Sequence, residues 1–226
     1  MNWKMKKLRN KMVIVFILTA VFVSCKGKND EVESRVASLP YYNDPAFTPH
    51  WLSPQSDSLK TFHKIPAFNL TNQDGKSVTD KTFDNKIYIT DFFFSTCPGI
   101  CPKMTANLAV VQEAFKNDDS VLLLSHSVTP DKDSVPVLKA YANEKGVISN
   151  KWHLLTGKKE EIYNLARNFY YVEEDQGVKK SINDFLHTEN FVLVDKSKHI
   201  RGIYNGLNAA SVQQLIADVK LLEKEK

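Results

Sequence analysis

The chain has 226 residues, of which 42% are hydrophobic and 25% charged, and its formal net charge is +4. Five basic residues and no acidic ones lie within residues 1–24, so the remaining 25 basic and 26 acidic residues nearly cancel. A near-neutral body without a lysine or arginine cluster excludes nucleic acid as a partner on electrostatic grounds.

Residues 1–24 have the pattern of an export signal. The basic residues precede a run of twelve apolar residues, "MVIVFILTAVFV", which suits the apolar region of a signal peptide and is short for a membrane span. The following "FVSC" resembles the lipobox of bacterial lipoproteins, in which the cysteine, here Cys25, is lipidated and becomes the first residue. Phe22 stands where that box usually has leucine. An uncleaved membrane anchor is the alternative, and both interpretations place the remaining chain outside the cytoplasm, tethered to a membrane and facing the periplasm or the cell exterior.

Residues 25–61 are polar and contain four prolines, at positions 40, 45, 49 and 54. This composition predicts a tether that leads into irregular chain. Residues 62–226 are long enough for a single domain with an apolar core.

The predicted elements follow in chain order from residue 65. Residues 65–79 carry Asn-Gln-Asp-Gly between short apolar segments, which predicts a hairpin with Gly75 in its turn. "KIYITDFFF", residues 86–94, is β-branched and aromatic almost throughout, as in a strand buried on both faces. From Pro102 the apolar spacing becomes that of a helix, with proline in its first turn.

The second half continues with alternating elements. The patterns predict a strand at 120–128, helices at 133–146 and 159–170, a hairpin from 190–195 to 199–206, and a final helix through Leu222. The order hairpin, strand, helix, strand, helix, helix, hairpin, helix favours an α/β sandwich of the thioredoxin-like fold. We expect a mixed central sheet with helices on both faces and an added N-terminal hairpin.

Two of the three cysteines, Cys97 and Cys101, lie between the buried strand and the helix that follows it. The partial positive charge of a helix N-terminus favours ionisation of a thiol there, so we expect at least one reactive cysteine. If the loop folds like a helical turn, the two positions lie about 6 Å apart, which permits a disulfide or two bonds to one soft metal ion.

Three kinds of site fit this pair. A purely structural disulfide would close a five-residue ring and contribute only about 2 kcal/mol, which a domain of this size does not need. A closed zinc site needs two further ligands. A site of two thiolates and one imidazole suits Cu(I) best, because thiolates are soft ligands.

Six histidines are candidates for the imidazole ligand. His126 lies mid-strand and is expected to pack beside the sheet, His153 follows a helix-to-strand turn, and His199 is expected at an exposed hairpin tip. His50 and His63 belong to the irregular N-terminal part. His187 ends a loop before a strand that could pair near the cysteine loop, but position alone does not single it out.

Four ordered segments resemble the Sco/SenC family: "DFFFSTCPGICPKMTANL", "SVTPDKDSVPVLKAYA", "WHLLTG" and "HTENFVLVDKSKHIRGIYNG". The resemblance covers roughly residues 65–222. One departure is Thr129, which stands where the family often has aspartate before the proline. The resemblance implies that Cys97, Cys101 and His187 bind copper, as Cu(I) or Cu(II), and that Asp91 lies near the site without binding the metal.

The resemblance also implies a function. It is that of a membrane-tethered copper chaperone that delivers copper to the CuA site of cytochrome c oxidase subunit II, or reduces that subunit's cysteines with electrons from a thiol reductant. Another exported copper protein is an alternative target. The rival function is that of a thiol:disulfide oxidoreductase without metal, for which His187 is not required. A passive copper store is a further alternative, and a peroxidase is disfavoured because no arginine is placed beside the cysteine loop.

Overall fold

The computed structural model describes residues 32–172 and 188–225. Residues 33–226 form one compact unit, so residues 33–61 belong to the same body as the domain predicted from residue 62 onward. Leu39, Tyr41 and Leu59 are each buried within it. In the described part of the chain, no helix is long and apolar enough to cross a membrane.

A seven-stranded sheet in the order β2-β1-β5-β4-β3-β6-β7 forms the centre of the described residues. Its strands are β1 (Asn69–Asn72), β2 (Ser77–Thr79), β3 (Ile87–Phe93), β4 (Val121–Ser127), β5 (Trp152–Thr156), β6 (Asn190–Val194) and β7 (Ile200–Asn205). β4 pairs in parallel with β3 and β5, whereas all other pairs are antiparallel. The predicted mixed sheet and both predicted hairpins are thereby confirmed.

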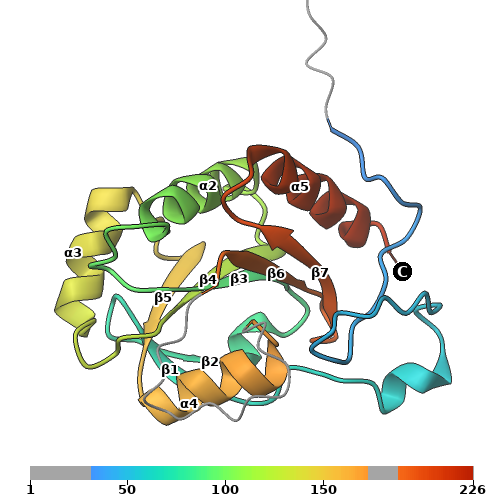
Figure 1. The fold of residues 1–226 in the computed structure, drawn as a ribbon, viewed down its shortest axis with the longest axis horizontal. Helices are drawn as coiled ribbons and strands as arrows, with labels where there is room; N and C mark the ends of the chain where they lie inside the picture. Colours follow the sequence, from blue (N-terminus) through green and yellow to red (C-terminus); the bar gives the residue numbers. More distant parts are fainter. Residues whose placement is uncertain (1–31, 173–187, 226) are drawn as a thin grey trace, which may run out of the picture. The chain divides into compact units, whose positions relative to one another are not determined.

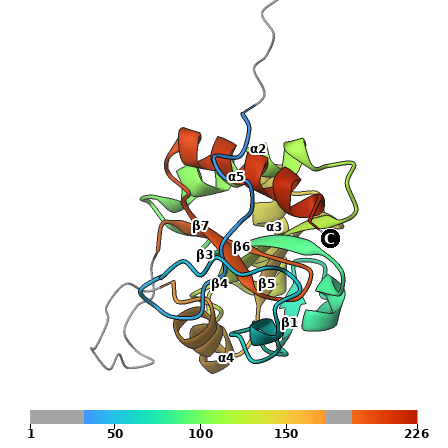
Figure 2. The same ribbon diagram turned by 90° about the vertical axis from the view of Figure 1, so that its right-hand side faces the viewer.

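Helices cover both faces of this sheet, as predicted. The helices are α2 (Cys101–Ala114), α3 (Val135–Lys145), α4 (Lys159–Asn164) and α5 (Ala209–Glu223). α2, α3 and α5 pack on one face, and α4 packs on the other (Figure 1). The view in Figure 2 shows α2 and α5 side by side above the sheet and α4 below it.

The expected order of elements omitted one strand. β5 inserts between β4 and β1, where its parallel pairing with β4 aligns Leu123 with Trp152 and Ser125 with Leu154. All five residues of β5 are buried. The predicted helix at 159–170 also ends earlier, because α4 passes into a π-helical turn at Leu165–Phe169.

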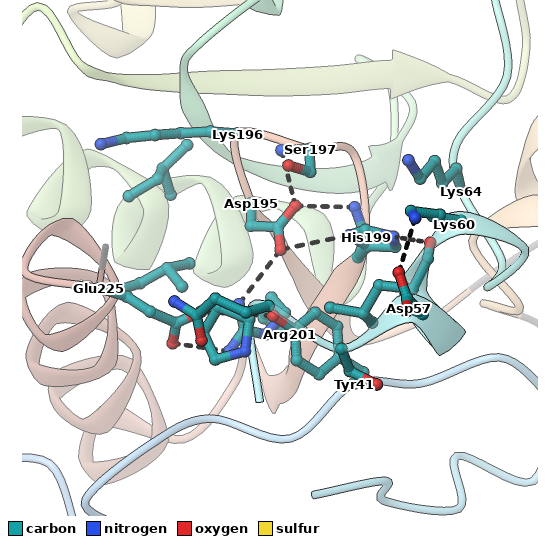
Figure 3. Close-up of a pocket in the computed structure, with 16 residues that line it drawn as sticks. Tyr41, Asp57, Lys60, Lys64, Asp195, Lys196, Ser197, His199, Arg201 and Glu225 are labelled. Atoms are coloured by element: carbon teal, nitrogen blue, oxygen red, sulfur yellow. Dashed lines mark hydrogen bonds and ion pairs between the residues drawn. The ribbon is translucent and has the colours of Figure 1, made fainter. Parts of the chain in front are cut away.

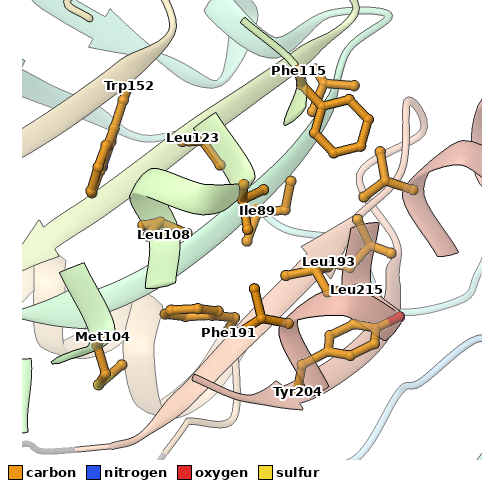
Figure 4. Close-up of a cluster of buried hydrophobic side chains, with 14 of the residues drawn as sticks. Ile89, Met104, Leu108, Phe115, Leu123, Trp152, Phe191, Leu193, Tyr204 and Leu215 are labelled. Carbon is orange, nitrogen blue, oxygen red and sulfur yellow. The ribbon is translucent and has the colours of Figure 1, made fainter. Parts of the chain in front are cut away.

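The larger core lies between the sheet and the face formed by α2, α3 and α5 (Figure 4). Met104, Leu108 and Val111 of α2 are fully buried there, which confirms the predicted helical face. They pack over Ile89 of β3 and Phe191 of β6. Cys101, at the start of α2, belongs to this same core, so the fold holds one of the two thiols inside the protein.

Local signals explain how the chain enters and leaves these elements. Gly75 has φ of +73° in the β1–β2 turn, a conformation that glycine adopts without steric cost. Gly146 has φ of +69° and ends α3 in a left-handed cap. Pro102 lies in the first turn of α2, where its missing N–H leaves no intrahelical bond unmade.

Candidate functional site

The two thiols lie where β3 gives way to α2. All seven residues of β3 are buried, and a loop of residues 94–100 leads from its end to Cys101, the first residue of α2. Cys101 is 5% exposed, whereas Cys97 in the loop is half-buried. Both are free thiols. One sulfur is therefore open to a partner and the other is covered by the core.

The Cys97 sulfur sits among hydrogen-bond donors. Burial raises the pKa of this thiol, but the Cys101 thiol and the backbone N–H groups of Cys101, Gly99 and Ile100 donate to its sulfur, and the net result is a lowered pKa. The Cys101 N–H is the first of α2, and those of Gly99 and Ile100 directly precede it, so the free donors at this helix start stabilise the thiolate. Cys97 is thus the more readily ionised of the two cysteines.

Cys101 has the opposite character. Burial, followed by the hydrogen bond that its thiol donates to Cys97, raises its pKa to about 12. The negative charges of Cys97 and Asp91 raise it further, while a backbone hydrogen bond with Phe94 acts in the opposite direction. Cys97 therefore loses its proton before Cys101, and the ionisation of each thiol affects that of the other.

Asp91 is buried in β3, six residues before Cys97, and its negative charge acts on Cys101. Ser125 of β4 donates a hydrogen bond to the Asp91 carboxylate, and the indole N–H of Trp152 donates to the Ser125 hydroxyl at 2.8 Å. Burial raises the pKa of Asp91 to about 7, against the lowering effect of the Ser125 hydrogen bond. Asp91 thus acts electrostatically on the buried thiol, and its place beside a bound metal stays a prediction.

His187 and Cys25 lie outside the described residues. The chain is described again from Thr188, and β6 then runs antiparallel to β3 with Thr90 opposite Val192. The start of β6 therefore lies beside the end of β3, at the same end of the sheet as the cysteine loop. Glu189 accepts a backbone hydrogen bond from Gly206, whose carbonyl accepts one from Asn107 of α2, so the residues after 187 are fixed beside the helix that carries Cys101.

The other histidines are engaged elsewhere. His126 is fully buried and stacks on Phe92, with ring centroids 4.8 Å apart, as expected for a histidine packed beside the sheet. His199 is 3% exposed, so the expected exposed hairpin tip is wrong: the rings of Tyr41 and Phe62 cover it. Within residues 32–172 and 188–225, no three His, Cys, Asp or Glu side chains are grouped to hold a metal ion.

A residue that sequence reasoning missed connects the cysteine loop to β4. Asp133 is fully buried between the end of β4 and the start of α3, and it accepts hydrogen bonds from the backbone N–H and the hydroxyl of Ser95. Ser127 and Thr129 also donate to it. Its position just before a helix gave no sign of this role, because acidic residues are common there for other reasons.

A separate cavity of about 520 Å³ lies at the opposite end of the sheet, beside the start of β3 and the end of β6 (Figure 3). Its most buried charged residue, Arg201, has all five N–H donors in use. They bond the carbonyls of Leu39 and Pro40 and the carboxylates of Asp195 and Glu225. Arg201 therefore joins residues 39–40 to β7 and to Glu225 after α5, and it has no donor left for a ligand.

The geometry defines a class of protein: an α/β domain of the thioredoxin-like fold with an asymmetric dithiol where the first long strand meets a helix. The SCO1/SenC family model matches residues 56–223. The chain belongs to the SCO1/SenC family.

Individual relatives agree with this assignment. The chain is 30% identical over 162 residues to the SCO1 protein homolog of Bacillus subtilis, covering 70% of this chain and 82% of that protein. The structure of BsSco, a member of the Sco family of cytochrome c oxidase assembly proteins with an identified disulfide switch, has a TM-score of 0.60 at 29% identity, over 73% of this chain and 95% of that one. ScoI of Bradyrhizobium japonicum with copper bound has a TM-score of 0.55 at 26% identity, over 71% and 98%.

Proposed function

We propose that this protein is a membrane-tethered copper chaperone that binds one copper ion through Cys97, Cys101 and His187. On this proposal it serves the assembly of cytochrome c oxidase, by delivering copper to the CuA site of subunit II or by reducing the cysteines of that subunit. The adjacent pair of one half-buried, easily ionised thiol and one buried thiol is the observation that carries the proposal.

The donor set fits copper as cargo. Two sulfurs within hydrogen-bonding distance of one another can both contact one ion, and soft thiolates prefer Cu(I). Binding by both sulfurs displaces the proton that the Cys101 thiol carries, so copper binding is linked to the release of that proton. The copper-bound ScoI structure supports the same use of this fold.

His187 is the proposed third ligand. The residue that follows it, Thr188, is described, and the segment it begins is bonded through Gly206 to α2 at the cysteine end of the sheet. This attachment, together with the family resemblance around His187, supports the assignment. The five described histidines have other contacts. His126, His153 and His199 are buried at theirs. The two ring nitrogens of His63 bond the Phe169 carbonyl and the Tyr171 hydroxyl, and the His50 ring packs against Phe62.

Copper release is proposed to follow oxidation of the dithiol. When Cys97 and Cys101 form a disulfide, two electrons pass to a disulfide or another two-electron oxidant, and both sulfurs lose the charge that holds the ion. A thiol reductant would then restore the binding form. The disulfide switch identified in BsSco supports this cycle.

The location of the protein is also a proposal. The basic and apolar segments of residues 1–24 and the lipobox-like Cys25 support export and attachment to a membrane through a lipid on Cys25. The body would then face the periplasm or the cell exterior, where an exported copper site is assembled.

The alternative function is thiol:disulfide exchange without metal. In it the Cys97 thiolate attacks a disulfide of the partner and forms a mixed disulfide, and Cys101 then attacks the Cys97 sulfur and releases the partner as a dithiol. The partner gains two electrons and two protons, and this protein keeps the disulfide. The lowered pKa of the half-buried Cys97 favours this step as well, so the pair alone does not separate the two functions.

His187→Ala separates them. We expect the variant to lose copper binding while it retains disulfide reductase activity, since exchange needs only the two sulfurs. A strain that carries His187→Ala and assembles an active oxidase at the wild-type level would contradict the chaperone function. Cys97→Ser, which abolishes both activities, is the matched control.

A further inference from the structure

The cysteine loop is fixed at both of its ends, by different means. At the far end, α2 begins at Cys101, and the Ile100 carbonyl accepts backbone hydrogen bonds from Lys103 and Met104. At the near end, Ser95 bonds the Asp133 carboxylate through its hydroxyl at 2.5 Å and its N–H at 3.2 Å. Cys97 lies between these two anchors, so its sulfur can meet the N–H groups of α2 only while both hold.

The second anchor is a buried carboxylate held by neutral donors. Asp133 is 0% exposed, and both its oxygens act as acceptors. Ser127 donates to it at 2.5 Å and Thr129 at 3.1 Å, and the Ser127 hydroxyl in turn accepts from the Thr129 N–H. Hydrogen bonds to a carboxylate are stronger than those between neutral groups, so this cluster ties the loop firmly to the end of β4.

The cluster does not serve the helix that follows it. Asp133 directly precedes Ser134, the N-cap residue of α3, yet its described partners all belong to the cysteine loop and to residues 127–129. The N-cap Ser134 itself makes no side-chain capping bond. A carboxylate that was present only to stabilise α3 would bond the free N–H groups of that helix.

We infer that Asp133 is a positioning residue for the dithiol, which acts through Ser95 to hold the Cys97 sulfur over the N-terminal N–H groups of α2. Thr129 stands where the family often has aspartate, and here its hydroxyl donates a hydrogen bond to Asp133. In this cluster the carboxylate that anchors the loop is therefore that of Asp133. The consequence for copper rests on the proposed function, whereas the consequence for thiol reactivity does not.

The test measures alkylation of Cys97 in the reduced full-length protein by iodoacetamide between pH 5 and 10, read on the peptide that carries Cys97 by mass spectrometry. Asp133→Asn and Ser95→Ala are expected to raise the midpoint of the pH–rate profile by about one unit, which lowers the rate below the midpoint about tenfold. Ser95→Thr, which keeps the hydroxyl, is expected to restore the wild-type profile. The double variant Asp133→Asn/Ser95→Ala is expected to have the same profile as Asp133→Asn, because both changes disrupt the same Ser95–Asp133 hydrogen bonds.

Ser120→Ala is the matched control. It removes a serine hydroxyl that donates to Asp118 and Glu223 at the other end of β4, and we expect the wild-type profile. Wild-type profiles for both Asp133→Asn and Ser95→Ala, or an equal shift in Ser120→Ala, would overturn the inference. Cu(I) titration of the same proteins adds a separate result: a wild-type protein that binds no copper refutes the proposed function and leaves the alkylation result to decide the role of Asp133.

Discussion

Replacement of Asp91 by asparagine should change how stability depends on pH. The Asp91 carboxyl is buried, and its described side-chain partner is the Ser125 hydroxyl. Burial raises its pKa to about 7 from an ordinary value of 3.8. Between these values the folded protein holds a proton that the unfolded chain releases, so the free energy of unfolding falls as pH rises from 4 to 7.

The magnitude follows from the pKa difference. A shift from 3.8 to about 7 corresponds to about 4 kcal/mol of unfolding free energy, and this cost is complete above pH 7 and absent below pH 4. The asparagine of the variant carries no charge at any pH. Its amide hydrogens need acceptors that a carboxylate does not need, which adds a constant cost of about 1–3 kcal/mol at every pH.

Urea unfolding of wild type and Asp91→Asn at pH 4, 5, 6, 7 and 8, with a reductant present, measures this difference directly. We expect the stability of the variant relative to wild type to increase by about 4 kcal/mol from pH 4 to pH 8. The constant cost of the amide cancels in that comparison. A relative stability that is the same at pH 4 and pH 8 would refute the argument that Asp91 is held in its neutral form by burial.

Four further outcomes are expected. Iodoacetamide should modify Cys97 before Cys101 at pH 7, and peptide mapping that found Cys101 modified first would contradict the assigned asymmetry. The apparent Kd for Cu(I), from competition titration, should rise by at least about tenfold for each unit that pH falls below 8, because binding displaces the Cys101 proton; a Kd that does not change with pH would contradict binding by both sulfurs. Arg201→Met should lower the unfolding free energy by about 3–5 kcal/mol, since it takes their arginine partner from the buried Asp195 and the half-buried Glu225 carboxylates; a loss below about 1 kcal/mol would show that these ion pairs are dispensable. Burial lowers the pKa of His126 to about 4, so its contribution is present above pH 6.5 and lost as pH falls to 4; His126→Leu should reduce the acid sensitivity seen in urea unfolding by about 3 kcal/mol, and unchanged sensitivity would contradict this.

Much of the fold could be predicted because its strongest signals are local. The apolar runs of β3 and β4 and the helical spacing of α2 and α5 follow from residue types alone. β5 was missed because its five residues, Trp-His-Leu-Leu-Thr, neither alternate between apolar and polar nor form an unbroken apolar run. Its place in the sheet depends on Gln73, whose side-chain amide bonds the Trp152 carbonyl and the Leu154 N–H from the distant β1–β2 turn.

At the candidate site, too, the local features could be predicted and the tertiary contacts could not. The position of Cys97 and Cys101 at a helix start could be predicted from the strand, the loop and the proline that surround them. Their unequal environments could not, because burial of Cys101 depends on packing of α2 against the sheet and on neighbours such as Asp91. The carboxylate of Asp133 reaches Ser95 from 38 residues away, and only the tertiary structure brings the two together.

The prediction for His199 failed for a related reason. Its neighbours Lys196, Ser197 and Lys198 read as an exposed turn, and the backbone there does turn, with φ of +71° at Lys198. The residues that cover the imidazole, Tyr41 and Phe62, come from the irregular N-terminal segment, which has no periodic pattern that would predict its packing.

The most direct test of the central claim is Cu(I) titration of the reduced protein together with Cys97→Ala, Cys101→Ala and His187→Ala. We expect one copper ion per wild-type chain and a large loss of affinity in each variant, since each removes one of three ligands. Wild-type binding in all three variants would contradict the claim that these residues form the copper site.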